Sequence, residues 1–157
     1  CTNYECYKGL YSSFNCMNLF EIAHSLNRQF GPEDWCIYRG KHLMTFADNH
    51  DVTRLASILT NPAHIPLAYG LLLGMPGIPC LYYGSEWGQT GKKEQGSDAS
   101  LRPEYEKPLP NDLTKYIKKL VEIRNKYKSA QLLHFGIKIK YAFSKALTSK
   151  TDRLTKA

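Results

Sequence analysis

The sequence is short of acidic residues. Its 157 residues include 14 Asp and Glu against 21 Lys and Arg, which leaves a formal net charge of +7. A basic excess of this size is compatible with nucleic-acid binding. Much of it, however, lies in lysines of the C-terminal third, where no recognisable nucleic-acid-binding module interleaves them with aromatic residues. We interpret these lysines as a solvated helix face and a basic tail, and expect no nucleic-acid partner; a small basic nucleic-acid-binding protein stays as an alternative.

Paired cysteines are also lacking. The five cysteines are odd in number, and no two of them form a Cys-x-x-Cys pair; they are Cys1, Cys6, Cys16, Cys36 and Cys80. This pattern predicts neither a zinc site nor a disulfide framework, and it favours reduced, mostly buried thiols. Reduced thiols favour a cytoplasmic location, although a chain that starts at Cys1 instead of Met leaves room for a lost signal peptide.

A continuous apolar helix long enough to cross a membrane is absent as well. Residues 65–84 carry no charged side chain, which is about the length of a membrane span. Three prolines and Gly77 interrupt the segment, so it cannot form one unbroken helix. We predict a buried helix over 65–74, a turn over 75–77 and a strand over 78–83, and expect no membrane partner.

Strands and helices alternate along the first part of the chain. A short apolar run predicts a strand at 43–46, and apolar residues at helical spacing predict a helix over 19–30. Residues 1–4 are predicted to be the tail of a further strand, with the polar Asn3 at its exit, on the same side as the polar residues after 43–46. Residues 5–14 are predicted to form a loop, and residues 52–59 a helix. All-apolar strands that alternate with helices are typical of the α/β class, in which helices cover the outside of a parallel sheet.

The C-terminal part has a different pattern. Asn111 and Asp112 open the last clear helix, which is predicted to end near Tyr127. Its predicted inward face consists of Leu113, Tyr116, Ile117, Leu120, Val121, Arg124 and Tyr127. Large apolar residues at 137, 139, 141 and 143 then alternate with Lys138, Lys140 and Ala142, which predicts a half-buried strand. Residues 148–157 form a polar, basic tail.

One strand is followed directly by a polar cluster. Residues 43–46 are mostly apolar, and Asp48, Asn49, His50 and Asp51 come directly after Ala47. Asp51 precedes the predicted 52–59 helix, so its carboxylate is a candidate N-cap. Two carboxylates close together repel each other unless the site uses them. From the residues alone, a capping role and a binding or catalytic role both stay open.

Three segments carry a resemblance to a known family. Phe46-Ala47-Asp48-Asn49-His50-Asp51 resembles the end of the seventh barrel strand in the alpha-amylase family of glycoside hydrolases. Residues 77–88, Gly-Ile-Pro-Cys-Leu-Tyr-Tyr-Gly-Ser-Glu-Trp-Gly, resemble the eighth strand and the loop after it. Residues 97–103, Ser-Asp-Ala-Ser-Leu-Arg-Pro, resemble the loop that closes over the sugar site. The three segments occur in the order found in the family.

The resemblance implies a fold class and a domain organisation. A complete (β/α)8 TIM barrel needs about 250 residues, so the chain is expected to be the C-terminal fragment of such a barrel. Residues 1–130 would supply about strands 6 to 8 and their helices. Residues 131–157 would supply the start of a C-terminal β-sandwich domain and the basic tail. Three strand-helix units leave open strand edges, so we expect the fragment to self-associate.

The resemblance also implies roles for individual residues. Asp51 matches the family's third catalytic carboxylate, which supports the oxocarbenium-like transition state. His50 matches a substrate-binding histidine in the subsite where cleavage occurs, and Asn49 and Arg102 are expected to assist in substrate binding. Structural support of the site is expected from three further residues, which are Asp48, Glu86 and Tyr83. No metal ligand is expected among them.

The implied function is part of a retaining glycoside hydrolase that acts on alpha-linked glucans or maltooligosaccharides. Retaining hydrolysis needs a carboxylate nucleophile and an acid/base carboxyl group. The family's motifs for these, of the Arg-x-Asp and Glu-x-x-Asp type, have no match upstream of Asp48, so the isolated chain is expected to be inactive. The family often binds calcium through segments with no match here, so no cofactor is expected in this chain. A non-catalytic remnant that binds a sugar or a partner protein stays as an alternative.

Overall fold

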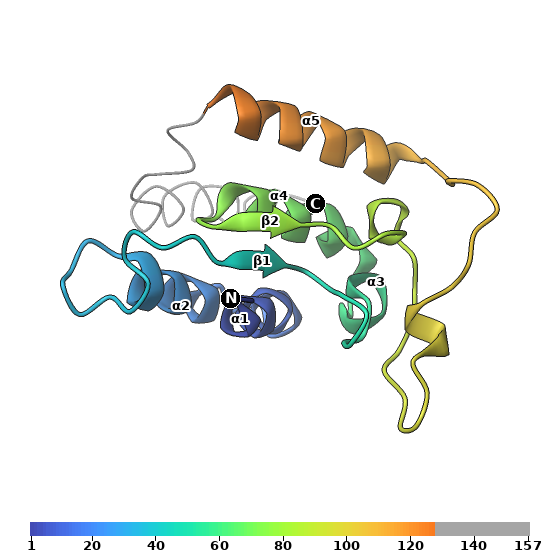
Figure 1. Cartoon of the computed structure of the whole chain (residues 1–157), viewed down its shortest axis with the longest axis horizontal. Coiled ribbons are helices and arrows are strands. Elements are labelled where there is room, and N and C mark those ends of the chain that lie inside the picture. Colours follow the sequence, from blue (N-terminus) through green and yellow to red (C-terminus); the bar gives the residue numbers. More distant parts are fainter. Residues whose placement is uncertain (128–157) are drawn as a thin grey trace, which may run out of the picture.

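The computed structural model describes residues 1–127, in which helices lie against one side of a short parallel sheet (Figure 1). The strands are β1 (Met44–Phe46) and β2 (Ile78–Cys80). The α-helices are α1 (Tyr4–Asn15), α2 (Phe20–Phe30), α3 (Leu55–Ile58), α4 (Ile65–Gly74) and α5 (Asp112–Lys126). Short 3-10 helices occur at Pro62–His64, Ser85–Trp87 and Ala99–Leu101.

The sheet consists of parallel segments that follow one another in sequence. β1 and β2 pair in parallel, with Met44 opposite Ile78 and Phe46 opposite Cys80. Thr2 forms a further parallel bridge to Met44 on the other side of β1. Each of these three segments is followed by a helix, as expected for an α/β protein. The strand tail predicted over 1–4 and the strand predicted over 78–83 are present but shorter, as one bridge at Thr2 and as β2.

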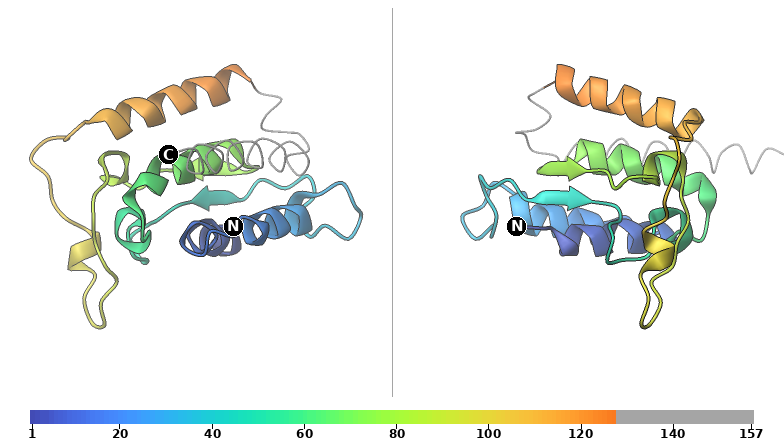
Figure 2. Two further views of the ribbon diagram at one scale, coloured as in Figure 1. Left: turned by 180° about the vertical axis from the view of Figure 1, so that it is seen from behind. Right: turned by 45° about the vertical axis from the view of Figure 1, so that its right-hand side comes forward.

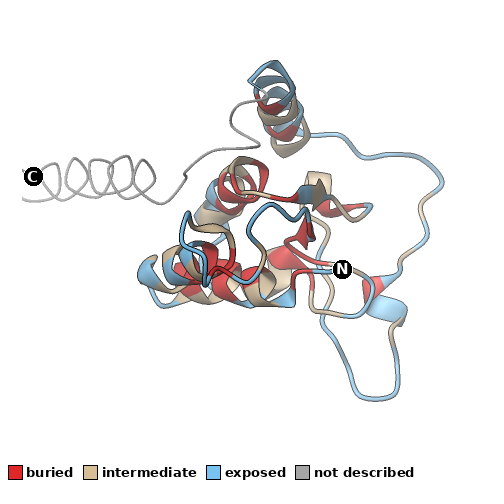
Figure 3. Ribbon diagram, turned by 60° about the vertical axis from the view of Figure 1, so that its left-hand side comes forward, coloured by how far each residue is buried: buried red, intermediate tan, exposed pale blue. Residues whose placement is uncertain are grey.

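One face of the sheet is covered and the other is partly open. α1 and α2 run beside β1, and α4 runs beside β2 (Figure 2). Buried residues of these three helices, coloured red in Figure 3, belong to one core cluster. Leu10, Ile22 and Leu72 are each at most 2% exposed in this core. On the strands, the register partners Met44 and Ile78 are 39% and 59% exposed. The sheet therefore presents apolar side chains to solvent.

The expectation of a loop over residues 5–14 is wrong, because these residues form α1. Asn3 caps the helix by accepting a hydrogen bond from the Cys6 amide at 2.9 Å. The Asn3 side-chain amide also donates to Gln29 Oε1 at 2.7 Å, which ties the start of α1 to α2. Cys6, Leu10 and Phe14 lie one helical turn apart and are buried, so the helical spacing of this segment was present in the sequence.

The uncharged segment over residues 65–84 folds as predicted into a buried helix, a turn and a strand. α4 ends at Gly74, and the turn that follows passes through Gly77 at a φ of +109°. A Cβ atom at Gly77 would lie 2.6 Å from the Leu43 carbonyl oxygen, so only glycine fits between α4 and the sheet. Within residues 1–127, no helix is both long and apolar enough to cross a membrane.

The last described helix has its predicted extent, but Tyr116 and Tyr127, which were expected on its inward face, are 38% and 53% exposed. Asn111 caps α5 by accepting from the Thr114 amide at 3.2 Å, and the Thr114 hydroxyl in turn accepts from the Asn111 amide at 3.1 Å. Arg124, on the inward face, donates to the carbonyls of Leu73 at 2.6 Å, Met75 at 3.1 Å and Gly77 at 2.7 Å. α5 is thus fastened to the end of α4. The strand predicted over 137–143, the basic tail and the domain assigned to 131–157 lie outside the described residues.

Candidate active site

The candidate site lies at the carboxyl ends of β1 and β2, where the loops that leave two adjacent parallel strands meet. The loop after β1 contains Asp48 to Asp51, and the loop after β2 leads through Ser85 into the extended segment 89–102 (Figure 1). That segment returns to the β1 loop through three hydrogen bonds. The Arg54 amide donates to the Gly91 carbonyl at 2.9 Å, the Gly91 amide to Ser57 Oγ at 2.9 Å, and the Lys93 amide to Thr53 Oγ1 at 3.0 Å.

Arg54 joins these loops from the inside. The residue is 0% exposed. Its Nη1 donates to the Tyr83 carbonyl at 2.7 Å and to Ser85 Oγ at 3.0 Å, and its Nη2 donates to the Leu101 carbonyl at 2.7 Å. The guanidinium carbon also lies 4.1 Å from the centre of the Tyr82 ring, within range of a cation–π interaction. A single side chain therefore holds the loop after β2 and the 98–102 segment against the start of α3.

Asp48 is buried beside Arg54 and shares the Ser85 hydroxyl with it. The residue is 3% exposed. One carboxylate oxygen accepts from Ser85 Oγ at 2.6 Å and the other from the Leu55 amide at 2.7 Å. Burial raises the pKa of Asp48 above its ordinary value of 3.8, against the opposing effects of these two hydrogen bonds and of the nearby Arg54 charge. Asp48, not Asp51, thus supplies the carboxylate at the start of α3, and the alternative in which Asp51 caps this helix is wrong.

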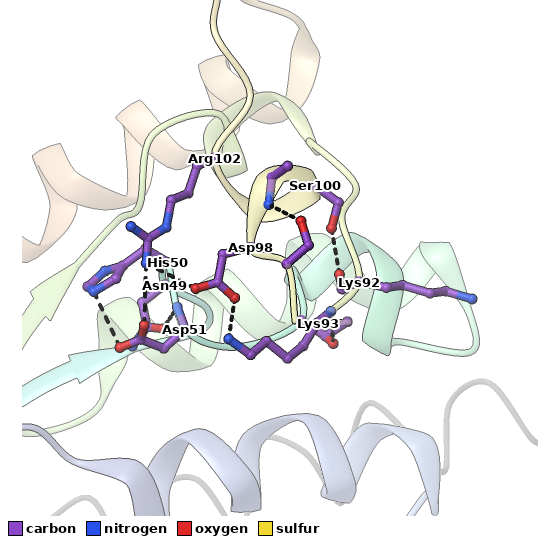
Figure 4. A network of polar contacts seen from close by, with 11 residues as sticks. Asn49, His50, Asp51, Lys92, Lys93, Asp98, Ser100 and Arg102 are labelled. Atoms are coloured by element: carbon purple, nitrogen blue, oxygen red, sulfur yellow. Dashed lines mark hydrogen bonds and ion pairs between the residues drawn. The ribbon is translucent and has the colours of Figure 1, made fainter. Parts of the chain in front are cut away.

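A second, solvent-facing group of charged side chains belongs to the same loops (Figure 4). His50 Nε2 is 3.3 Å from one Asp51 carboxylate oxygen, and Arg102 Nη2 is 3.6 Å from the other. The same Arg102 nitrogen is 3.3 Å from Asp98, which also pairs with Lys93. The hydrogen bond from Lys93 is the main cause that lowers the pKa of Asp98. Asp51 is half exposed at 50%, so its carboxylate is accessible to a ligand.

Asn49 shapes the turn that presents Asp51. Its side-chain oxygen accepts from the Asp51 amide at 2.8 Å, an interaction that holds the backbone in a tight turn. Its side-chain nitrogen lies 3.5 Å from the Tyr4 hydroxyl at the start of α1. Asn49 therefore contacts the chain itself on two sides.

Tyr83 and Glu86 lie beside the site and connect its loops through hydrogen bonds that involve main-chain carbonyls. The Tyr83 hydroxyl donates to the Pro103 carbonyl at 3.1 Å, next to Arg102, while its ring is 42% exposed. The Glu86 carbonyl accepts from Thr114 Oγ1 at 2.9 Å and so connects the loop after β2 to α5. Among the described residues, the buried Glu86 Oε2 has no hydrogen-bond partner.

All the residues singled out from the sequence lie around this edge of the sheet. Asp48 is buried, whereas the side chains of Asp51, His50 and Arg102 are about half exposed. Asn3 was expected at the same edge but serves as the buried cap of α1. Arg54 and Ser85 were missed. Nothing in the sequence distinguishes Arg54 from an ordinary exposed residue in a first helical turn, because its partners are carbonyls 29 and 47 residues away. Within residues 1–127, no group of three His, Cys, Asp or Glu side chains is arranged to hold a metal ion.

Replacing Arg54 with alanine is expected to lower the free energy of unfolding by about 3 kcal/mol, because two carbonyls and a buried hydroxyl lose their donor. Arg54→Lys should lose less but remain clearly destabilised, since one ammonium cannot reproduce the two-pronged contact. Urea denaturation followed by circular dichroism measures both. The matched control is Arg39→Ala, which removes an arginine from an exposed ion pair with Asp34 and should cost at most about 1 kcal/mol. Equal effects at the two positions would contradict the anchoring role of Arg54.

The raised pKa of Asp48 predicts a pH-dependent difference between the native protein and Asp48→Asn. A carboxyl group whose pKa is higher in the folded state contributes stability that is fully present below the unfolded pKa, near 3.8, and is lost as pH rises through the folded pKa. The asparagine variant lacks this titration. The unfolding free energy of the native protein minus that of Asp48→Asn should therefore fall as pH rises from about 3.5 and level off above the folded pKa. A difference that rises over this window would show that the pKa of Asp48 is lowered instead.

Comparison with known proteins identifies related sequences. Residues 14–114 match the family model for the alpha-amylase catalytic domain. The chain is 37% identical over 59 residues to an alpha-amylase of Saccharomycopsis fibuligera, and 38% identical over 66 residues to a cyclomaltodextrin glucanotransferase of Bacillus sp. (strain 1-1). These matches cover 38% and 42% of the chain, but only 12% and 8% of the two relatives.

Solved structures agree with this assignment. An Anoxybacillus alpha-amylase is 25% identical, with a TM-score of 0.62 over 83% of this chain and 28% of its own. The alpha-amylase from Geobacillus thermoleovorans, solved with acarbose, is 23% identical, with a TM-score of 0.62 over 83% of this chain and 29% of its own. The described residues thus share the fold of part of the alpha-amylase TIM barrels, although they span well under half the length of these enzymes. Since the family model matches most of the chain, the chain belongs to the alpha-amylase catalytic-domain family of glycoside hydrolases.

Proposed function

We propose that this chain supplies the C-terminal part of the barrel of a retaining glycoside hydrolase that acts on alpha-linked glucans or maltooligosaccharides. The three successive parallel segments at Thr2, β1 and β2 support an assignment to about the sixth, seventh and eighth barrel strands. Residues 1–130 then belong to the barrel, and residues 131–157 begin a C-terminal β domain. The observation that carries the function is the half-exposed Asp51, which lies between His50 and Arg102 above the buried Arg54 and Asp48.

In this proposal Asp51 is the carboxylate that stabilises the transition state. Positive charge builds on the sugar ring when the glycosidic bond breaks. A fixed carboxylate next to that ring lowers the barrier most effectively when its position is set before the reaction. The turn made by Asn49, which accepts from the Asp51 amide at 2.8 Å, supplies such a fixed position. Hydroxyl groups of a bound sugar would donate to the same carboxylate.

His50 and Arg102 are the proposed substrate contacts. The imidazole offers one donor and one acceptor, which suits a sugar hydroxyl. Arg102 lies on the segment tied to Arg54 through the Leu101 carbonyl at 2.7 Å, so its backbone has a defined position. Its side chain lies between Asp98 and Asp51, at 3.3 and 3.6 Å, and can turn toward a ligand without leaving either carboxylate buried and unpaired.

The chain by itself is proposed to be inactive. A retaining enzyme needs two carboxyl groups about 5 to 5.5 Å apart on either side of the scissile bond. The carboxylates near Asp51 are already engaged, Asp48 with Ser85 and Leu55, and Asp98 with Lys93. In addition, the sequence carries no motif of the Arg-x-Asp or Glu-x-x-Asp type upstream of Asp48. The nucleophile and the acid/base would therefore come from another segment of the complete barrel.

The isolated 157-residue chain is expected to release no reducing sugar from maltooligosaccharides. A chimera in which this chain replaces the corresponding part of the Saccharomycopsis fibuligera alpha-amylase should be active, and Asp51→Asn in that chimera should lower kcat by about a thousandfold, since the variant removes charge stabilisation made in the transition state. The control is Asp34→Asn, which changes a fully exposed carboxylate in the 31–41 loop and should leave kcat unchanged.

Two results would contradict this proposal. One is steady sugar release by the isolated chain that Asp51→Asn does not affect, and the other is equal kcat for the two chimera variants. Calorimetric titration of the isolated chain with maltooligosaccharide separates the alternative function. Affinity that depends on His50 and Asp51, together with an inactive chimera, would mean a non-catalytic sugar-binding module.

We also propose that the chain self-associates through its open sheet face. Met44 and Ile78 are adjacent register partners with exposed fractions of 39% and 59%, and the neighbouring Cys80 is exposed as well. Apolar side chains on a parallel sheet are normally covered on both faces. In a complete barrel other strands would enclose this face, and for the chain alone a second copy provides the same apolar surface.

Ile78→Lys is therefore expected to shift the purified chain toward the monomer, because a charge in the contact must be desolvated on association. Light scattering over a concentration series measures the shift. Phe20→Lys is the control, since Phe20 is even more exposed, at 75%, but lies on α2, away from the open sheet face. Native protein that stays monomeric at high concentration, or equal effects of the two variants, would refute association through the sheet face.

A further inference from the structure

Several apolar side chains of α5 and its C-cap remain exposed although the helix packs against the core. Its inward face consists of Leu113, Ile117, Leu120 and Val121, with Arg124 reaching the end of α4. A second set of apolar residues follows the helical spacing i, i+7 and i+11 along an adjacent face, the last of them being the C-cap of α5. We call this set the outer α5 stripe; it consists of Tyr116, Ile123 and Tyr127.

The outer α5 stripe is open to solvent in the described residues. Tyr116 is 38% exposed, Ile123 46% and Tyr127 53% (Figure 3 shows the exposed side of α5). A surface helix normally presents polar residues outside its single apolar face. Three large apolar side chains in line, over about 16 Å of helix, therefore indicate a surface that another segment covers.

The chain offers an occupant directly beyond this surface. Residues 137–143 read Ile-Lys-Ile-Lys-Tyr-Ala-Phe, so that Ile137, Ile139, Tyr141 and Phe143 would share one face of an extended segment. The stripe ends at Tyr127, and the ten residues from there to Ile137 can reach at most about 33 Å when extended. The segment can therefore fold back along the whole stripe, and its covalent attachment gives it an effective concentration in the millimolar range.

We infer that the outer α5 stripe is the docking surface for the apolar face of residues 137–143 of the same chain. Burial of apolar area drives the contact. Charge opposes it, because Lys119 and Lys126 flank the stripe on its solvent side while Lys138 and Lys140 accompany the apolar residues of the segment. Added salt screens this repulsion, so the docking strengthens at higher ionic strength. An acidic partner bound to the same lysines would behave in the opposite way.

Hydroxyl-radical footprinting of the native full chain tests this inference without any variant. Tyr127 and Tyr4 are similarly exposed in the described residues, at 53% and 48%. Docking of residues 137–143 predicts that Tyr127 is oxidised several-fold more slowly than Tyr4, at every protein concentration and also at high salt. Equal rates would overturn the inference. Protection of Tyr127 that disappears on dilution would also overturn it, since a second copy would then be the occupant.

A double-mutant cycle identifies the segment. Ile123→Ser and Ile139→Ser should each raise the unfolded fraction about tenfold, the effect expected for one buried aliphatic side chain. Because they remove the same contact, the double variant should also show about tenfold, not about a hundredfold. In the control cycle Phe20→Ser takes the place of Ile123→Ser, and its effect on the unfolded fraction should multiply with that of Ile139→Ser. Multiplying effects for Ile123 and Ile139, or Tyr127 protection that survives Ile139→Ser, would refute the assignment. Neither readout depends on sugar binding or activity.

Discussion

The structure of the site depends on one buried cation. Arg54 lies wholly inside the protein and forms no ion pair with a described residue, yet its guanidinium must remain charged. The cost of removing this charge from water is offset by the Tyr83 and Leu101 carbonyls, the Ser85 hydroxyl, the face of the Tyr82 ring and the nearby Asp48 carboxylate. All of these lie in the loops that follow β1 and β2, outside the α-helices and strands. The loops have a defined arrangement because each supplies a group that compensates the buried charge of Arg54.

Arg124 is a second buried arginine that binds main-chain carbonyls, in this case before the start of β2. It is 8% exposed and donates to the carbonyls of Leu73, Met75 and Gly77, so it satisfies the end of α4 and the turn before the strand. A planar guanidinium can join several carbonyls that point in different directions, which a lysine cannot do. The two arginines together fix the entry to β2 and the loop that leaves it. The side chains above them, His50, Asp51 and Arg102, can therefore stay exposed while their backbone is held in place.

The local patterns in the sequence predicted much of this arrangement. The alternation of strands and helices, the buried helix before Gly74, the cap at Asn111 and the inward position of Arg124 follow from hydrophobic spacing and from capping and turn residues, all of which act over a few positions. The prediction of a loop over residues 5–14 was wrong because the glycine and serines near Leu10 masked a helical stripe that begins at Cys6. The buried role of Arg54 could not be predicted, because two of its three hydrogen-bond partners are main-chain carbonyls, which every residue possesses, and the third is a hydroxyl 31 residues away. Hydrophobic spacing marks the side chains that enter the core, whereas only the folded chain brings distant carbonyls to one guanidinium.

The separation in sequence of the Arg54 contacts has a kinetic consequence. The guanidinium joins residues that are 29, 31 and 47 positions further along the chain. Closing loops of this length costs conformational entropy before any contact is gained, whereas α1, α2 and α4 can form from local interactions. Contacts of this kind slow folding and form after the helices. The carboxyl edge of the sheet should therefore assemble last and as one cooperative unit, and a transient loss of the Arg54 contacts would release all of its loops together.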